Sequence, residues 1–236
     1  MNFSHPFSFG MVKTNYRYSP LTKTIKGYIE WLIEYENGVP LQYIYLVCDD
    51  SPQFSKVMPS IGVTAFLKVE YKLQIKTKSV LLEVKIDKQE KSKTGKLMTY
   101  ISGKIYDDIN LYTTYNGLFI ESPLIPEKEY QKGTNDIDEF TIVRENTLPI
   151  YFLNVKDLYD TNDNIIIWKN GYGPSNHVHG GIISFPFLTE NKHISKIKIN
   201  YKKAIPLLSE SRIDIYDNKF KITNVKNDIQ AEGEFY

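Results

Sequence analysis

The sequence predicts an α+β fold made of two copies of one plan, an apolar helix followed by four antiparallel strands. Three observations predict it. Alternation of apolar and polar residues, typical of half-buried strands, fills most of the chain from Val63 onward. A shorter series of the same kind returns near the C-terminus, and an apolar segment precedes each series. With 236 residues, the chain is long enough to bury a core in each half.

The first half contains four predicted strands, separated by turn-rich pieces: 66–75, 80–86, 98–105 and 111–120. Antiparallel strands with one polar face need cover on the other face. The upstream segment 27–36 has apolar residues at roughly helical spacing, interrupted by Glu30, Glu34 and Glu36. We therefore expect a helix at 27–36 that covers this sheet.

The second half repeats this plan in shortened form. Its predicted strands are 197–202, 211–216, 220–225 and a last one that includes 233–235. The segment 180–191 aligns without a gap over 26–37, and both segments end in Glu-Asn. The stretch between the halves is polar and holds little that could pack. We expect a first repeat at 1–125, a connector at 126–147 and a second, shortened repeat at 148–236.

His179, Gly180 and Gly181 form the motif with the clearest chemical meaning, and they open the apolar run 182–188. Backbone N–H groups at a helix N-terminus can bind an oxyanion, a thioester carbonyl or a phosphate. The two glycine N–H groups are the expected oxyanion donors, because glycine lets a substrate approach the backbone closely. His179 or Asn176 would add a side-chain donor. The alternative is that the glycines only allow close packing.

The His-Gly-Gly step before an apolar helix resembles the motif of the acyl-CoA thioesterase branch of the hotdog superfamily. The repeated plan resembles a double hotdog, in which an antiparallel sheet wraps a central helix twice. This resemblance implies an acyl-CoA or acyl-carrier-protein thioester as substrate, and no cofactor apart from coenzyme A as part of that substrate. The related hydratase branch has an Asp-x-Asn pattern similar to 160–162, but Ile165 stands where that pattern has histidine.

The resemblance also implies an acidic residue on the central helix as the base. The matching position in the second half is Leu188, which carries no acid. Aligning Gly27 with Gly181 places Glu34 at the equivalent position of the first half. Paired hotdogs share their sites, so we expect one composite site, with Glu34 as base and Gly180 and Gly181 as donors. The alternative for Glu34 is a solvated helix residue.

Composition excludes several classes of function. The net charge of +1 does not favour nucleic acid or an anionic membrane as partner, and no apolar stretch is long enough to span a membrane. A single cysteine, Cys48, excludes an internal disulfide and a cysteine-based zinc site. His177 and His179 without a fixed carboxylate do not predict a metal site. The expected location is the cytoplasm, and both a monomer and a homo-oligomer remain open.

Three functions compete at this stage. The first is hydrolysis of an acyl thioester, which would make the protein a hydrolase of lipid metabolism. The second keeps the fold and changes the reaction to hydration or dehydration of an enoyl or 3-hydroxyacyl thioester, with His179 as acid and base. The third is a non-catalytic hotdog protein that binds a hydrophobic ligand or a partner. Three features favour the third function: Leu188 in place of an acid, Pro186 in the second helix and the shortened second half.

Overall fold

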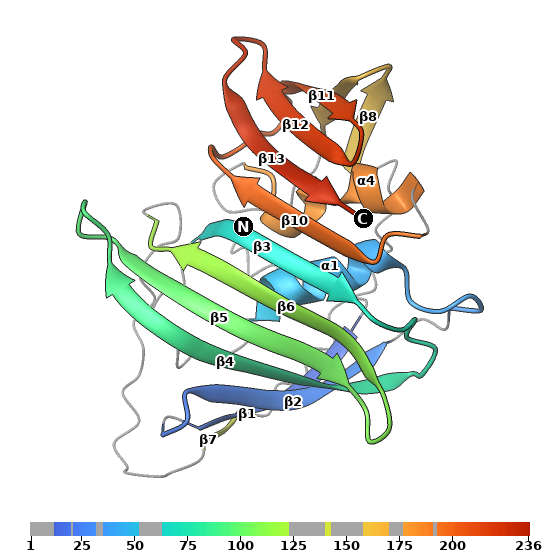
Figure 1. Ribbon diagram of the computed structural model, residues 1–236, viewed down its shortest axis with the longest axis vertical. Helices are drawn as coiled ribbons and strands as arrows, with labels where there is room; N and C mark the ends of the chain where they lie inside the picture. Colours follow the sequence, from blue (N-terminus) through green and yellow to red (C-terminus); the bar gives the residue numbers. More distant parts are fainter. Residues whose placement is uncertain are drawn as a thin grey trace, which may run out of the picture.

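The computed structural model describes residues 12–19, 21–31, 35–51, 63–122, 140–142, 158–169, 177–190 and 193–236. The strands within these ranges form one antiparallel sheet of 13 strands, in the order β7-β1-β2-β4-β5-β6-β3-β10-β13-β12-β11-β9-β8 (Figure 1). The strands are β1 Val12–Ser19, β2 Thr24–Trp31, β3 Val63–Tyr71, β4 Ser79–Lys91, β5 Leu97–Tyr106, β6 Leu111–Ile120, β7 Phe140–Ile142, β8 Tyr159–Asn162, β9 Ile165–Trp168, β10 Lys196–Tyr201, β11 Glu210–Tyr216, β12 Lys219–Asn224 and β13 Ile229–Phe235. The helices are α1 Leu41–Asp50, α3 Gly180–Ile183 and α4 Phe185–Glu190.

The same strand order occurs on both sides of the junction between β3 and β10. One side runs β2-β4-β5-β6-β3, and the other runs β9-β11-β12-β13-β10. In each, a helix follows the first strand along the chain, and the next strand returns to the far edge of the group. β3 and β10 then pair with each other, with Ile197 opposite Val69 (Figure 1). This junction makes the two groups one continuous sheet and brings their helices to the same side.

Two glycines occupy corresponding places in this arrangement. Gly117 of β6 stands opposite Leu67 of β3, and Gly233 of β13 stands opposite Ile199 of β10. A Cβ atom on Gly233 would lie 2.2 Å from the carbonyl oxygen of Lys198 and 2.5 Å from the ring of Phe220. Glycine at this position therefore allows the sheet and the buried aromatic ring beneath it to approach closely.

The helix expected at 27–36 is wrong. Residues 24–31 form β2, in which the buried Ile25, Ile29 and Trp31 share one face of the strand and the charged Lys26 and Glu30 share the other. Burial therefore alternates with a period of two residues, as in a strand. Tyr28 is exposed on the polar face, and when it is counted with the apolar residues their spacing resembles that of a helix. The alignment of Gly27 with Gly181 fails for the same reason, since one residue lies in a strand and the other in a helix.

The helix of the first half is α1, which lies behind β3 and β6 in Figure 1. It begins directly after Pro40, at a place where a missing N–H costs nothing. Its residues 44–48 are all buried and all apolar, with exposed fractions of 4% or less. Such a run has no polar stripe, so its sequence does not separate a buried helix from a buried strand.

The agreement of the other elements with the sequence patterns varies, and β1, β7 and β8 were not predicted. The second helical region begins at Gly180, as predicted, and divides into α3 and α4. β6 covers 111–120 as expected, whereas β3 ends at Tyr71, before the predicted end at 75. No helix in the described ranges is long and apolar enough to cross a membrane. The expected cytoplasmic location stays a prediction.

Candidate functional site

The N-terminus of α3 packs directly against α1. A Cβ atom on Gly181 would lie 2.4 Å from Cδ1 and 3.2 Å from Cα of Leu46. Only glycine lets the two helix backbones come this close without a shift of one of them. The carbonyl of Gly181 accepts a hydrogen bond from the hydroxyl of the buried Ser184 at 2.7 Å, which secures the turn. This packing brings the His-Gly-Gly motif of the second half onto the C-terminal part of α1.

Asp49 is the acidic residue that faces the motif, and it is only 1% exposed. Its Oδ1 accepts a hydrogen bond from Oγ1 of Thr64 at 2.7 Å. Its Oδ2 lies 3.4 Å from Nδ1 of His179. A Cβ atom on Gly180 would come within 3.0 Å of the same Oδ2, so glycine leaves room beside the carboxylate. A buried carboxylate and an imidazole from opposite halves of the chain thus meet at one point.

His179 is held by its own helix. It is the N-cap of α3, and its Nδ1 accepts the N–H of Gly181 at 3.1 Å. A ring nitrogen that accepts this bond carries no proton, so the neutral imidazole carries its proton on Nε2. His179 is 8% exposed. In this tautomer the N–H of the ring, at Nε2, is a hydrogen-bond donor.

Two tyrosines stand behind the motif. The hydroxyl of Tyr201 donates to the carbonyl oxygen of Gly180 at 2.9 Å, and the hydroxyls of Tyr45 and Tyr201 are 2.9 Å apart. Burial raises the pKa of Tyr201 well above its ordinary value, and the charge of Asp49 adds to this. Burial also raises the pKa of Tyr45, with further contributions from Tyr201 and Asp49. Both hydroxyls therefore remain protonated near neutral pH and act as donors.

The structure brings together three of the five predicted site residues, His179, Gly180 and Gly181. Glu34 and Asn176 lie outside the described residues. The N–H of Gly181, expected to bind an oxyanion, is occupied by His179. His177 lies in an isolated β-bridge with Pro206.

Sequence reasoning missed Asp49. The helix that carries it was not recognised, and Asp49-Asp50 reads as a polar end to an apolar run. The signal that could have found it is the buried-helix reading of 41–48, which places an acid at the end of the first central helix. Leu188 occupies the position at which the resemblance implied an acid, and it is buried, with an exposed fraction of 3%.

Among the described residues there is no group of three or more histidine, cysteine, aspartate or glutamate side chains that could hold a metal ion. The chemistry on offer is that of a carboxylate, an imidazole and hydroxyl donors. Such a set can accept a proton, donate a hydrogen bond to a developing negative charge, or do both in one reaction.

Solved structures of the hotdog fold resemble this chain over most of its length. HtdX of Mycobacterium tuberculosis has a TM-score of 0.57 at 11% identity, covering 86% of this chain and 89% of that chain. An acyl-ACP thioesterase from Bacteroides thetaiotaomicron has a TM-score of 0.55 at 10% identity, covering 95% and 97%. The 12:0-ACP thioesterase from Umbellularia californica has a TM-score of 0.51 at 11% identity, covering 90% and 96%.

A hotdog-fold protein from Alicyclobacillus acidocaldarius has a TM-score of 0.51 at 10% identity, covering 99% of this chain and 98% of that chain. At these identities the likeness shows the fold, and the chain has the hotdog fold that the sequence motif indicated. No protein-family model and no curated protein sequence matches the chain.

Proposed function

We propose that this protein hydrolyses an acyl thioester, of coenzyme A or an acyl-carrier protein, at one composite site between two hotdog repeats. The observation that carries the proposal is the approach of Asp49 from α1 to His179 from the start of α3. The strand order that recurs on both sides of β3 and β10 supports two repeats, for which we propose the bounds 1–125 and 148–236 with a connector at 126–147. Thioesterases among the structures of similar fold support the choice of substrate class.

In the proposed reaction, a water molecule attacks the thioester carbonyl carbon, and Asp49 takes the proton that the water loses. The carbonyl oxygen becomes an oxyanion, which accepts a hydrogen bond from Nε2 of His179. Collapse of this intermediate breaks the carbon–sulfur bond, and the thiolate takes the proton back from Asp49. The products are a carboxylic acid and a free thiol. Thr64 orients the carboxylate through its 2.7 Å hydrogen bond throughout.

Asp49 takes the role first expected of Glu34. The expectation for Glu34 depended on a helix at 27–36, and residues 27–31 of that segment belong to β2 instead. Gly180 contributes by its lack of a side chain beside Oδ2 of Asp49, and Gly181 by its N–H to His179. Asn176 stays a predicted additional donor.

The test is thiol release from a panel of acyl-CoA and acyl-carrier-protein substrates. Asp49→Asn keeps the size of the side chain and removes the base, so we expect a loss of about 10²–10⁴-fold in kcat. His179→Gln should cause a comparable loss, and the double variant should lose little more, because the two groups act together. Glu34→Gln is the control and should retain activity. Full activity in Asp49→Asn would overturn this assignment. So would a result in which Glu34→Gln loses activity while Asp49→Asn and His179→Gln keep it.

Hydration of an enoyl thioester is the second candidate, and the same contact favours it. A carboxylate and an imidazole 3.4 Å apart can accept a proton from water and deliver one to carbon. The two reactions differ in product: hydration removes the conjugated enoyl absorbance and releases no thiol. An acyl ligand that co-purifies with the protein, without turnover of either kind, would instead indicate the non-catalytic function.

Two of the three arguments from sequence for a non-catalytic protein are weakened by the structure. Pro186 lies in the first turn of α4, where proline is tolerated, and the second helical region divides just before it, at Ser184, into α3 and α4. The missing acid at Leu188 has a counterpart in Asp49, which reaches the motif from the other half.

A further inference from the structure

Tyr45 and Tyr201 are connected to His179 by hydrogen bonds that the proposed reaction does not use. The carbonyl oxygen of Gly180 and the N–H of Gly181 belong to one peptide group. Tyr201 donates to this oxygen at 2.9 Å, and the N–H donates to Nδ1 of His179 at 3.1 Å. One peptide group therefore connects a buried tyrosine hydroxyl to the imidazole.

The donor in each of these hydrogen bonds follows from the number of hydrogens that each group carries. Tyr201 has a single hydroxyl hydrogen, which it donates to Gly180, so Tyr45 must be the donor in the 2.9 Å bond between the two hydroxyls. Hydrogen bonds aligned in this way polarise one another. A donor on the carbonyl oxygen makes the N–H of the same peptide group a stronger donor toward His179.

Nδ1 of His179 has two competing partners. The N–H of Gly181 at 3.1 Å requires a bare nitrogen, whereas Oδ2 of Asp49 at 3.4 Å would favour a proton on it. The tautomer with a proton on Nδ1 would present a lone pair on Nε2 to the substrate. That lone pair would repel the oxygen of a thioester carbonyl, so the outcome of this competition decides what His179 can do.

We infer that Tyr201, backed by Tyr45, holds His179 in the Nε2–H tautomer through the Gly180–Gly181 peptide group, and is thus a positioning residue of the site. This inference rests on the proposed function only for its catalytic consequence, and the tautomer itself can be measured without turnover. Tyr201 acts through the carbonyl oxygen of Gly180, to which it donates. This bond strengthens the N–H of Gly181 as a donor to Nδ1 of His179.

The experiment is a long-range ¹H–¹⁵N correlation spectrum of the uniformly ¹⁵N-labelled full-length protein at neutral pH. The chain has 4 histidines, and the spectrum of His179→Gln identifies the signals of His179. We expect the wild type to show an unprotonated Nδ1 and a protonated Nε2. Tyr201→Phe should move the Nδ1 signal toward the protonated position. Tyr45→Phe, which leaves Tyr201 in place, should move it in the same direction by a smaller amount.

Tyr71→Phe is the matched control. Tyr71 is buried on β3, and its hydroxyl donates to the carbonyl oxygen of Leu41 at 3.3 Å and not to that of Gly180. It should leave the signals of His179 unchanged. A protonated Nδ1 in the wild type, an unchanged spectrum in Tyr201→Phe and Tyr45→Phe, or an equal shift in Tyr71→Phe would each overturn the inference.

Thiol release by the same variants separates this inference from the proposed function. We expect Tyr201→Phe to lower kcat by roughly tenfold with little change in KM, the size of one lost hydrogen bond. If the tautomer shifts as expected but no variant hydrolyses a thioester, the proposed function fails while the role of Tyr201 stands. If hydrolysis occurs and the tautomer does not respond to Tyr201, the inference fails alone.

Discussion

Gly180 lies so close to Asp49 that a Cβ atom on it would come within 3.0 Å of the carboxylate Oδ2. Its neighbour Gly181 faces a different group, the side chain and backbone of Leu46 on α1. The two adjacent glycines therefore serve different purposes. One leaves space beside the acid, and the other lets two helices pack.

Gly180→Ala should reduce activity with little effect on folding. The added methyl group would press on Oδ2 of Asp49 at 3.0 Å, and it would be in ordinary contact with Thr64, whose Oγ1 lies 3.4 Å from its place. Displacement of a reacting group by a fraction of an ångström to 1 Å costs about 10- to 100-fold in rate. The measurement is kcat for thiol release together with the melting temperature. A normal kcat would show that this space is not part of the site.

Gly181→Ala should instead lower the free energy of unfolding, by about 1–3 kcal/mol. Its methyl group would overlap Cδ1 of Leu46 at 2.4 Å and crowd the Cα of the same residue at 3.2 Å, and a helix backbone yields less readily than a side chain. Urea unfolding measured by circular dichroism tests this, with Gly180→Ala as the neighbouring control. Equal stability of the two variants would contradict the difference between the glycines.

Several strands of this fold could be predicted from sequence because their periodicity is set by burial on one face, whereas β1, β7 and β8 were not predicted and a helix was predicted in place of β2. β6 and β10 to β13 were found within one to four residues, since each alternates between core and solvent. The first central helix could not be found in this way. Buried on all sides, residues 44–48 of α1 show no alternation at all. The stretch 27–36 has apolar residues at roughly helical spacing and therefore predicts a helix, although its residues 27–31 belong to β2.

Some residues of the candidate site could be predicted from a local sequence motif, and others could not. His179, Gly180 and Gly181 are adjacent in sequence, so their motif was visible, and the expectation of a site shared by two halves came from the missing acid at Leu188. Asp49 could not be assigned, because its role depends on the packing of α1 against α3. Tyr201 could not be assigned either, because it lies on β10 and only the fold brings its hydroxyl to the carbonyl oxygen of Gly180.

Glu70 should make stability depend on pH in the acid range. Hydrogen bonds from Lys68 and Lys72 lower the pKa of its carboxyl from 4.5 to about 2. Because the folded-state pKa is the lower one, this stabilisation is present above pH 4.5 and is lost as the pH falls from there toward 2. Glu70→Gln should therefore unfold more readily than the wild type at pH 6, and the difference should vanish near pH 2.

Urea unfolding at several pH values and two salt concentrations measures this effect. Both lysines are partly exposed, so the difference between the two proteins should shrink in high salt. A difference that stays constant from pH 6 to pH 2 would mean that Glu70 acts through packing and not through its charge.

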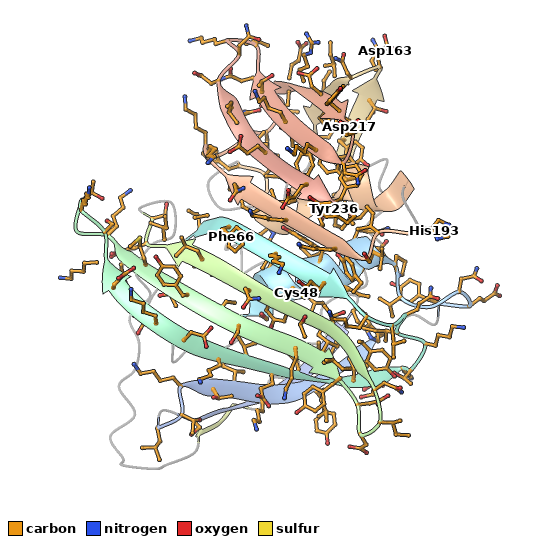
Figure 2. All side chains as sticks on the ribbon, in the orientation of Figure 1. Cys48, Phe66, Asp163, His193, Asp217 and Tyr236 are labelled. Carbon is orange, nitrogen blue, oxygen red and sulfur yellow. The ribbon has the colours of Figure 1, made fainter. Side chains whose placement is uncertain are left out.

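Cys48 should report on the integrity of α1. It is 0% exposed, lies one residue before Asp49 and is the single cysteine of the chain (Figure 2). Burial raises the pKa of its thiol well above the ordinary value, and the charge of Asp49 adds to this, so the reactive thiolate is disfavoured as well as shielded. A thiol reagent should label the native protein at least about 10³-fold more slowly than the protein in denaturant, because labelling requires unfolding.

The control moves the cysteine to the exposed turn between β4 and β5, as Cys48→Ser combined with Thr94→Cys. This thiol should react in the native protein as fast as in the unfolded one. If native Cys48 reacts as fast as the cysteine at position 94, then α1 opens without global unfolding, and the contact between Asp49 and His179 on which the proposed site depends is not permanently formed.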